Sequence, residues 1–513
     1  MNSFFKKAVT LLLCLSLCVS VLAGCAASSE EHICSTLSPE QLDAVQSASP
    51  DDSADATKPN IKTEEEKAKE FNDAFYTSYS NENFDVNNIS LTFAVLSDLH
   101  IGLHKQSEKL ESGMNFLSRR IPNGLDAVLL NGDITNSFDA SKNENQIIAA
   151  RDGLVNNLPE NTVFFYSLGP SHDCGGYDER ESPDGDSDRK VFIDVLGDRF
   201  HSSDVESKEE LEKGMKHAII EGYHFFSLDI EKADYSSDAL KWLREELEKV
   251  TKAEPNKSVF VMTHIPASTT LSEILNDFPQ VIYFSGHEHL PFNHPSAIFQ
   301  GNYTSLSIGG FAYYREAEVD SFSNRDNNNN YEYAQGYLVE VDTNGNTRVL
   351  RYDFYNEEVL DESWVIPSPK DDESHLEFYS NKVLNKIDKP EFPENAEVSI
   401  KINEENPFAP VEITFPAAKA ADGNPVIYYA VTIDVVEGSG VSETITKNIS
   451  SMFMKYPNNE NMPETYTVYV DGVATPYSYS VSIKAYNSRN RSSAALKGQL
   501  KSDGFADVER EKK

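Results

Sequence analysis

The sequence predicts an α/β domain at residues 88–389, followed by an all-β sandwich at residues 390–503. In the first region, continuous apolar runs alternate with amphipathic, helix-like segments, which is typical of sheets covered by helices on both faces. In the second region the helix-like segments stop, and short runs alternate between apolar and polar residues. The length of 513 residues suits two or three domains. The charged residues 504–513 are expected to form a tail.

The α/β prediction rests on strand-like apolar runs and on helix-like segments between them. Segment 236–250 is the clearest helix, because Ser236 suits an N-cap and Leu240, Leu243 and Leu247 share one face. The other expected helices are residues 108–119 and 143–156. The expected strands are residues 91–98, 127–133, 162–169, 223–229, 258–264, 280–287 and 303–310.

The sandwich prediction rests on seven short alternating runs with turn signals between them. Residues 477–487 and the following Ser-Arg-Asn-Arg-Ser-Ser resemble the last hairpin of a fibronectin type III module. Phe415 stands where that family usually has Trp. The seven expected strands are residues 397–403, 410–416, 426–436, 443–449, 465–470, 477–487 and 494–500.

The N-terminus predicts export and a lipid anchor. Within residues 1–25, two lysines precede an apolar run that ends in Leu-Ala-Gly-Cys25. This ending resembles the lipobox of bacterial lipoproteins, which implies cleavage before Cys25, a lipid on its sulfur, and an extracytoplasmic location on the bacterial cell membrane. An ordinary cleaved signal and an uncleaved anchor are the alternatives. Residues 26–62 are expected to be a disordered tether, and residues 63–87 a helical lead-in.

Charge and cysteine content exclude some classes of protein. The 45 Lys and Arg against 83 Asp and Glu give a net charge of −38. Proteins that bind nucleic-acid polymers obtain their affinity from Lys and Arg on phosphates, so we expect no such partner. A small phosphorylated substrate remains compatible, since metal ions can meet its charge locally. Of the five cysteines, only Cys34 and Cys174 lie beyond the lipobox, so the sequence predicts no disulfide framework.

Side chains that bind metals follow five of the expected strands. Taken singly, a Gly-Asp pair usually marks a turn, and a lone histidine is usually structural. As an ordered series they predict a metal site, because parallel strands bring their carboxyl ends to one edge of a sheet. Carboxylates with imidazoles suit Zn²⁺, Mn²⁺ or Fe²⁺, and the lack of clustered cysteines argues against a closed structural zinc site. The series is Asp98, His100, Asp133, His172, Asp173, His264, His287 and His289.

The motifs that carry this series resemble the calcineurin-like metallophosphoesterase family. They are Asp98-x-His100, Gly-Asp133, His172-Asp173, His264 and Gly-His287-x-His289. The resemblance implies a four-layer sandwich, in which two mixed β-sheets are flanked by helices, and a site with two divalent metal ions.

The resemblance also implies a role for each side chain. Asp98, His100 and His289 would hold one metal. His264 and His287 would hold the other, and Asp133 would bridge the two. His172 would be the acid that protonates the leaving oxygen, with Asp173 orienting its ring.

The implied function is hydrolysis of a phosphomonoester or phosphodiester at the cell surface. Two metal ions (Mn, Fe or Zn) would activate a hydroxide that attacks phosphorus directly, without a covalent enzyme intermediate.

Two positions depart from related patterns. The family's third motif has Asn as a metal ligand. Here Ser171 takes its place, which would weaken binding of the second metal. Asn136 stands where purple acid phosphatases have Tyr, so we expect no tyrosinate-bound ferric ion. The alternative function is a surface binding protein with a degenerate, weakly active metallophosphoesterase fold. Loops 177–190 and 315–333 are expected to shape the cleft. Arg189 is among the candidate contacts for an anion, with a solvated loop charge as the favoured alternative.

Overall fold

The computed structural model describes residues 83–501 with gaps. The predicted lipoprotein signal, the tether, most of the helical lead-in and the charged tail lie outside the described residues. The gaps are residues 122–123, 138–139, 175–184, 201–207, 231–234, 291, 293–296, 316–328, 332, 360–362, 371, 385–387, 403–410, 420–425, 438–439, 452–462, 471–477 and 488–490.

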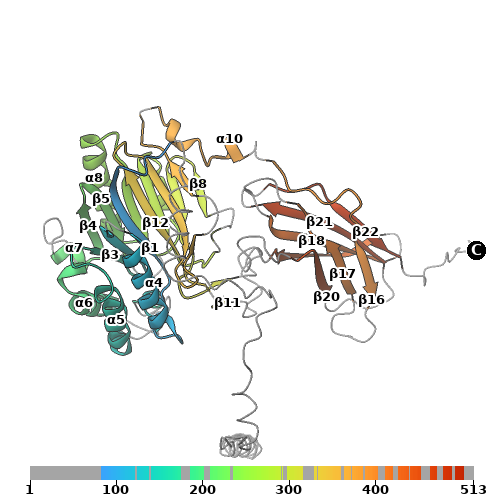
Figure 1. Ribbon diagram of the computed structural model, residues 1–513, viewed down its shortest axis with the longest axis horizontal. Helices are drawn as coiled ribbons and strands as arrows, with labels where there is room; N and C mark the ends of the chain where they lie inside the picture. The colour runs from blue at the N-terminus through green and yellow to red at the C-terminus, as the bar shows by residue number, and fades with distance from the viewer. Residues whose placement is uncertain are drawn as a thin grey trace, which may run out of the picture. The chain divides into compact units, whose positions relative to one another are not determined.

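A first mixed sheet contains the strand β1 near its centre (Figure 1). Its order is β14-β13-β12-β1-β2-β3, and β15 also pairs with β13. The strands β1, β2 and β3 are parallel, whereas β12 and β13 run antiparallel to their neighbours. The bounds are β1 Ile89–Leu96, β2 Ala127–Asn131, β3 Val163–Ser167, β12 Gln335–Asp342, β13 Thr347–Asp353, β14 Glu358–Val359 and β15 Trp364–Ile366.

A second mixed sheet has the order β4-β5-β6-β7-β9-β8. The strands from β5 through β6 and β7 to β9 are parallel, and β4 and β8 close the two edges in antiparallel pairing. The bounds are β4 Met215–Ile220, β5 Tyr223–Leu228, β6 Val259–Thr263, β7 Val281–Ser285, β8 Ile298–Gln300 and β9 Thr304–Ser307.

The two sheets pack face to face, because β1 is apolar on both sides. Phe93 and Val95 point into the core between the sheets, and Ala94 and Leu96 point into a second core beneath helices. The Phe93 ring meets the rings of Phe225 and Phe260 with centroids 5.2 and 5.0 Å apart. Each such buried ring stabilises the fold by about 1.5–3 kcal/mol relative to an exposed one.

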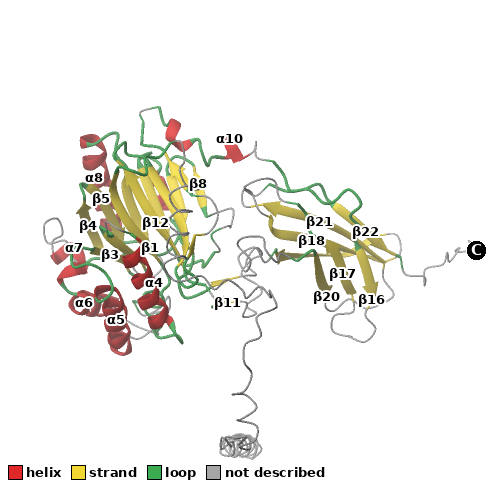
Figure 2. Cartoon of the chain, viewed as in Figure 1, coloured by secondary structure: helices red, strands yellow, loops and turns green. Residues whose placement is uncertain are grey.

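Helices cover the outer faces of both sheets and complete four layers (Figure 2). The first sheet is covered by α4, α5 and α6, and the second by α8 and α9. Ser236 caps α8, as predicted, by accepting a hydrogen bond from the backbone N–H of Ala239. The bounds are α4 Gln106–Arg120, α5 Ala140–Val155, α6 Gly185–Leu196, α8 Ser237–Ala253 and α9 Thr269–Leu275. The predicted α/β fold class is confirmed.

Short elements connect the layers. They are the 3₁₀ turns η1 Asp198–Phe200 and η2 Ser374–Leu376, the helices α7 Lys208–Glu212 and α10 Asn381–Leu384, and the pair β10 Tyr314–Arg315 and β11 Asn329–Asn330.

The C-terminal region forms two antiparallel sheets around its own apolar core. One has the order β16-β17-β20 and the other β19-β18-β21-β22. Phe415 is buried in this core and packs against Tyr429 and Tyr466. All seven predicted strands are present: β16 Ser399–Ile402, β17 Val411–Pro416, β18 Val426–Glu437, β19 Gly440–Ser450, β20 Thr465–Val470, β21 Ser478–Asn487 and β22 Leu496–Leu500. Among the helices that the structure describes, none has the length and apolar character to cross a membrane.

Candidate metal centre

The predicted ligands follow the carboxyl ends of strands from both sheets. In the first sheet, Asp98 and His100 follow β1, and Asp133 follows β2. In the second sheet, His264 follows β6, and the pair His287 and His289 follows β7.

Backbone hydrogen bonds join these loops. The N–H groups of Asp98 and His100 donate to the carbonyls of Gly132 and Asp133, each with a donor–acceptor distance of 3.0 Å. The N–H of His287 donates to Asp98 Oδ2 at a distance of 3.1 Å, and this hydrogen bond joins the second sheet to the first.

One group of ligand atoms comprises Asp98, His100 and His289, all buried, with their ligand atoms within 4.8 Å of one another. His289 Nε2 lies 3.2 Å from Asp98 Oδ1 and 3.3 Å from His100 Nε2. The other oxygen, Asp98 Oδ2, accepts a hydrogen bond of 2.6 Å from the hydroxyl of Ser97. Oδ1 therefore faces the cluster while Oδ2 fixes the carboxylate.

A second group comprises Asp133, His264 and His287, and a third joins Asp133 to His100 and His172. His264 Nε2 lies 3.2 Å from Asp133 Oδ2 and 4.0 Å from Asp98 Oδ1. Asp133 thus belongs to two groups and lies between them. The His172 ring meets the His100 ring edge-on, with centroids 4.5 Å apart, so His172 borders the same cluster.

Backbone carbonyls orient three of the histidine rings. The Nδ1 atoms of His264, His289 and His172 lie 2.8, 2.9 and 3.1 Å from the carbonyl oxygens of Asn131, Tyr313 and Asn136. A carbonyl oxygen only accepts, so each Nδ1 carries a proton, and Nε2 is left to face the cluster. A histidine that binds a metal through Nε2 keeps its proton on Nδ1 in this way.

Backbone strain is concentrated in the same residues. Asp98, His100, Asp133, His287 and His289 have φ angles of 56°, 45°, 47°, 72° and 51°. Side chains other than glycine rarely adopt this left-handed conformation, which costs on the order of 1–3 kcal/mol per residue. Such strain is retained where the surrounding structure fixes a functional geometry.

The electrostatics of the cluster favour a cation. Burial disfavours charge on Asp98, yet His289, His264 and His100 hold the pKa of its carboxyl well below the usual range. Burial opposes ionisation of Asp133 as well, but His264 lowers its pKa to about 2. Burial also favours a neutral His264, but the carboxylates of Asp133 and Asp98 raise its pKa to about 10. Two ionised carboxylates in a buried site therefore draw positive charge toward them.

Unsatisfied atoms show that divalent cations fit. In the described part of the structure, Asp98 Oδ1, Asp133 Oδ1 and His264 Nε2 are buried without a hydrogen bond of good geometry. A buried polar atom left in this way is costly unless another partner satisfies it. Carboxylate oxygens and imidazole nitrogens together are the donors that Mn²⁺, Fe²⁺ and Zn²⁺ accept.

Comparison with known protein families finds a match for the region that carries these ligands. The model of the calcineurin-like phosphoesterase family matches residues 91–291, which include every predicted ligand. The predicted resemblance to this family is therefore confirmed for residues 91–291, and we call the α/β region the phosphoesterase domain.

Solved structures show weaker likenesses. The chain is similar to a purple acid phosphatase from yellow lupin (Lupinus luteus) seeds, with 11% identity, a TM-score of 0.37, and a match over 55% of this chain and 54% of that chain. It therefore spans about half the length of that protein. It is also similar to the twitchin kinase region from C. elegans, with 16% identity, a TM-score of 0.15, and a match over 24% of this chain and 18% of that chain. A search of curated proteins gave no match.

Asp173 makes contacts beyond the role predicted for it. Its carboxylate accepts hydrogen bonds from the backbone N–H groups of Thr135 (3.0 Å) and Gly169 (2.9 Å). The Asn136 carbonyl accepts from Nδ1 of His172 and so also orients that ring. Burial and the charge of Asp133 raise the pKa of Asp173 to about 6. Asp173 therefore fixes the loop that carries Ser171 and His172, and Ser171 is buried in that loop.

Arg189 was among the candidate anion contacts, but the phosphoesterase domain uses it internally. Its side chain is 2% exposed, and Nε lies 3.2 Å from Asp229 Oδ2. Asp229 Oδ1 accepts hydrogen bonds from Lys216 Nζ (2.6 Å) and from the backbone N–H of Leu168 (2.8 Å). This buried cluster supports the end of β3, just before the loop of His172.

Sequence reasoning missed three residues that shape the centre. Ser97 holds Asp98, the Asn131 carbonyl holds His264, and Tyr313 stacks on His289 with ring centroids 4.1 Å apart. Ser97 is a polar residue at the end of an apolar strand, and this pattern could have indicated its role. Asn131 acts through its backbone carbonyl, which its residue type does not indicate. The place of Tyr313 depends on the fold, and no local pattern indicates it.

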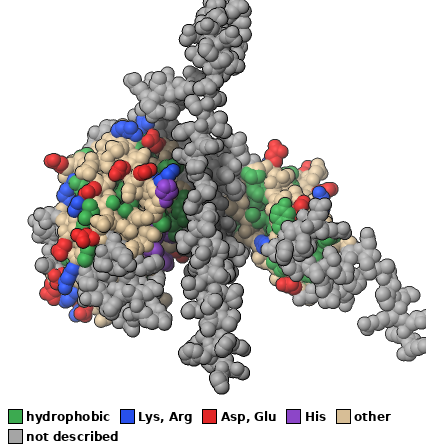
Figure 3. Space-filling model, turned by 90° about the horizontal axis from the view of Figure 1, so that it is seen from below, with side chains coloured by type: hydrophobic (Ala, Val, Ile, Leu, Met, Phe, Trp, Pro, Cys, Tyr) green, Lys and Arg blue, Asp and Glu red, His purple; other side chains and the backbone are tan. Residues whose placement is uncertain are grey.

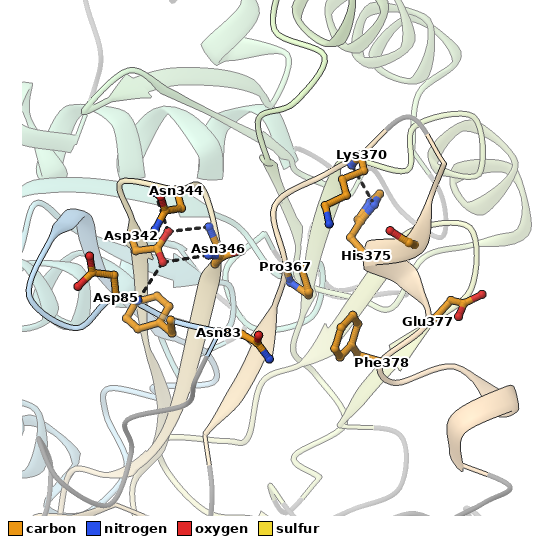
Figure 4. A pocket seen from close by; sticks show the side chains of 12 residues that line it. Asn83, Asp85, Asp342, Asn344, Asn346, Pro367, Lys370, His375, Glu377 and Phe378 are labelled. Carbon is orange, nitrogen blue, oxygen red and sulfur yellow. Dashed lines mark hydrogen bonds between the residues drawn. The ribbon is translucent and has the colours of Figure 1, made fainter.

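A large cavity lies away from these ligands, at the start of β1 and the end of β12 (Figure 4). Its volume is about 1010 Å³. Asp342 lines it, and its carboxylate already accepts hydrogen bonds from the backbone N–H groups of Asp85, Asn344 and Asn346. None of the described lining residues is a predicted ligand, so the cavity is separate from the metal centre.

Proposed function

We propose that the chain is a cell-surface phosphoester hydrolase with two divalent metal ions in this centre. The observation that carries the proposal is the convergence of two ionised carboxylates, Asp98 and Asp133, with Nε2-directed imidazoles from both sheets. One ion would lie among Asp98, His100 and His289, the other between His264 and His287, with Asp133 shared. Two such ions, when bound, neutralise phosphate charge and lower the pKa of a water.

The residues of the chain would divide the remaining work. The Asn136 carbonyl accepts the Nδ1 proton of His172, which leaves Nε2 to face the cluster. A protonated Nε2 there would donate to the oxygen that leaves phosphorus. The half-buried ring remains open to solvent and can regain its proton.

The test is hydrolysis of aryl phosphate mono- and diesters by the purified full-length protein with added Mn²⁺. Asp133→Asn and His172→Ala should lower kcat by about 10²–10⁴-fold, as removal of a positioned acid or ligand does. The matched control is His224→Gln on β5, which lies outside all three ligand groups and should keep full activity. Unchanged activity in both site variants would refute the proposal.

The substrate class follows from charge. With a net charge of −38, a small phosphorylated molecule suits the chain better than a nucleic-acid polymer. On the face drawn in Figure 3, acidic and basic side chains are interspersed on the described residues. A phosphate would be bound by the metal centre itself.

The location and the C-terminal module are part of the same proposal. A lipid on Cys25 would hold the protein on the outer side of a bacterial cell membrane. The strand order β16-β17-β20 and β19-β18-β21-β22 supports a fibronectin type III-like module that acts as a spacer. Partition of the wild type into a detergent phase, and of Cys25→Ser into the aqueous phase, tests the anchor.

A further inference from the structure

A run of aromatic rings leads outward from the metal centre. The rings of His100 and His289 are stacked, with centroids 5.2 Å apart and planes 16° apart. Tyr313 stacks on His289 at 4.1 Å and 10°. Tyr331 then lies against Tyr313, at 5.2 Å and 51°. Two ring contacts thus join a metal ligand to Tyr331.

Tyr331 differs from the inner rings in its exposure. His100 and His289 are 1% and 3% exposed, whereas Tyr331 is 47% exposed. An aromatic ring costs free energy when it faces water, because its apolar surface stays hydrated. Tyr331 therefore presents a large exposed ring two ring contacts away from His289, a candidate metal ligand.

A buried lysine holds the backbone that carries this ring. Lys109, on α4, is 4% exposed and donates hydrogen bonds to the carbonyls of Ala312 (3.2 Å), Tyr331 (2.5 Å) and Tyr333 (3.1 Å). It therefore joins the backbone on both sides of Tyr313 and Tyr331 to one rigid helix. A preorganised ring binds a ligand at a smaller cost in entropy than a mobile one.

We propose that Tyr331, supported by Tyr313, is the subsite for the alcohol part of the substrate, and that this part is a planar aromatic group. The substrates would be aryl or nucleobase-bearing phosphoesters, with phosphate at the metals and the ring against Tyr331. The inference rests on the proposed function, because it needs phosphate at the metal centre. Stacking of one base on an aromatic side chain corresponds to about a 5–100-fold gain in affinity.

The experiment compares two phosphonates that cannot be hydrolysed. Binding of phenylphosphonate and methylphosphonate to the Mn²⁺-loaded, full-length protein is measured by calorimetry. The wild type should bind phenylphosphonate about 5–100-fold more tightly than methylphosphonate. Tyr331→Ala should bring this ratio close to 1, and Tyr331→Phe should keep it. The matched control is Phe378→Ala, which removes a ring of 46% exposure in the distant cavity and should leave the ratio unchanged.

Two results would overturn the inference. The first is a ratio near 1 in the wild type. The second is a ratio that survives in Tyr331→Ala, and if both phosphonates lose affinity equally the role of Tyr331 is structural. Failure of the proposed function is a different observation, namely no turnover of phenyl phosphate by a protein that still prefers phenylphosphonate.

Discussion

Individual side chains in the centre are oriented by hydrogen bonds to their immediate neighbours rather than by extended hydrogen-bond networks. Ser97 holds one oxygen of Asp98, and single carbonyls fix the tautomers of His264 and His289. Three ligand atoms, Asp98 Oδ1, Asp133 Oδ1 and His264 Nε2, are left without good hydrogen bonds, which is costly in a buried site unless metal ions satisfy them. The residue that departs from the family pattern is Ser171.

Ser171→Asn should raise the affinity for the second metal ion. The amide oxygen of Asn reaches further than the hydroxyl of Ser and is a better metal ligand. We therefore expect the affinity for the second ion to rise at least about 10-fold, comparable to other changes around metal ligands. Mn²⁺ titration followed by electron paramagnetic resonance measures the two affinities. Ser171→Ala is the control and should give no gain. Equal second-site affinity in wild type and Ser171→Asn would show that this position does not face the metals.

Gly286→Ala should disturb the metal centre through packing. A Cβ at this position would lie 1.8 Å from Ser97 Oγ and 2.9 Å from Asp98 Oδ2. Because Ser97 must move away from Asp98, we expect about 1–3 kcal/mol of lost stability together with weaker metal binding. Thermal unfolding with and without Mn²⁺ measures both effects. Gly301→Ala, whose Cβ would come 3.3 Å from an exposed ring edge, is the control; similar losses in both variants would contradict the steric argument.

At the scale of elements, the sequence predicted the parallel strands and missed their antiparallel neighbours. The parallel strands are apolar runs that end in metal ligands, so periodicity and chemistry agree. The strands β12 and β13 were missed because they bury a charged pair, in which Arg348 Nε donates to Glu340 over 2.8 Å. Helix α6 was missed because Arg189, on its inner face, looked like a loop charge.

The candidate site was predicted better than the loops that support it. The ligands could be predicted because strand ends converge by topology alone. The backbone partners of Asp173 could not, because they depend on which N–H groups the folded loop brings to the carboxylate. The aromatic pair Tyr313 and Tyr331 depends in the same way on how Lys109 joins three separate carbonyls.

Lys109→Met should loosen this support without touching the metals. It removes the lysine donor from the carbonyls of Tyr331 and Tyr333, whereas Ala312 keeps its hydrogen bond from Gln106 Nε2, and the loss costs about 1–3 kcal/mol. We expect a lower melting temperature and a phenylphosphonate preference that falls toward that of Tyr331→Ala, with Mn²⁺ affinity retained. Lys241→Met, on the exposed face of α8, is the control. A full preference in Lys109→Met would show that the lysine only stabilises the fold.

The β4–β5 hairpin should make stability depend on pH. Burial and the neighbouring His224 lower the pKa of His217 to about 4. Since an unfolded histidine titrates near 6.5, the unfolded chain binds the extra proton and stability falls as pH drops from about 6.5 to 4. His217→Phe, which keeps the stacking on Phe226, should reduce this loss. Melting temperatures of the wild type and His217→Phe between pH 4 and 8 measure this loss of stability. If both melting temperatures fell by the same amount with pH, His217 would not be its source.

For the whole molecule, we propose that the phosphoesterase domain supplies the chemistry, and that the N-terminus and the sandwich supply location and spacing. The net charge of −38 makes a local cluster of divalent cations the natural binding site for a phosphate. Function at this scale therefore depends on how many ions the centre holds and where they lie.

The most direct measurement is anomalous diffraction from a crystal of the Mn²⁺-loaded protein. We predict two peaks about 3.5–4 Å apart, one beside Asp98 Oδ1 and His289 Nε2, the other beside His264 Nε2, with Asp133 touching both. A map with no peak at this cluster, or with manganese bound only elsewhere on the chain, would contradict the account.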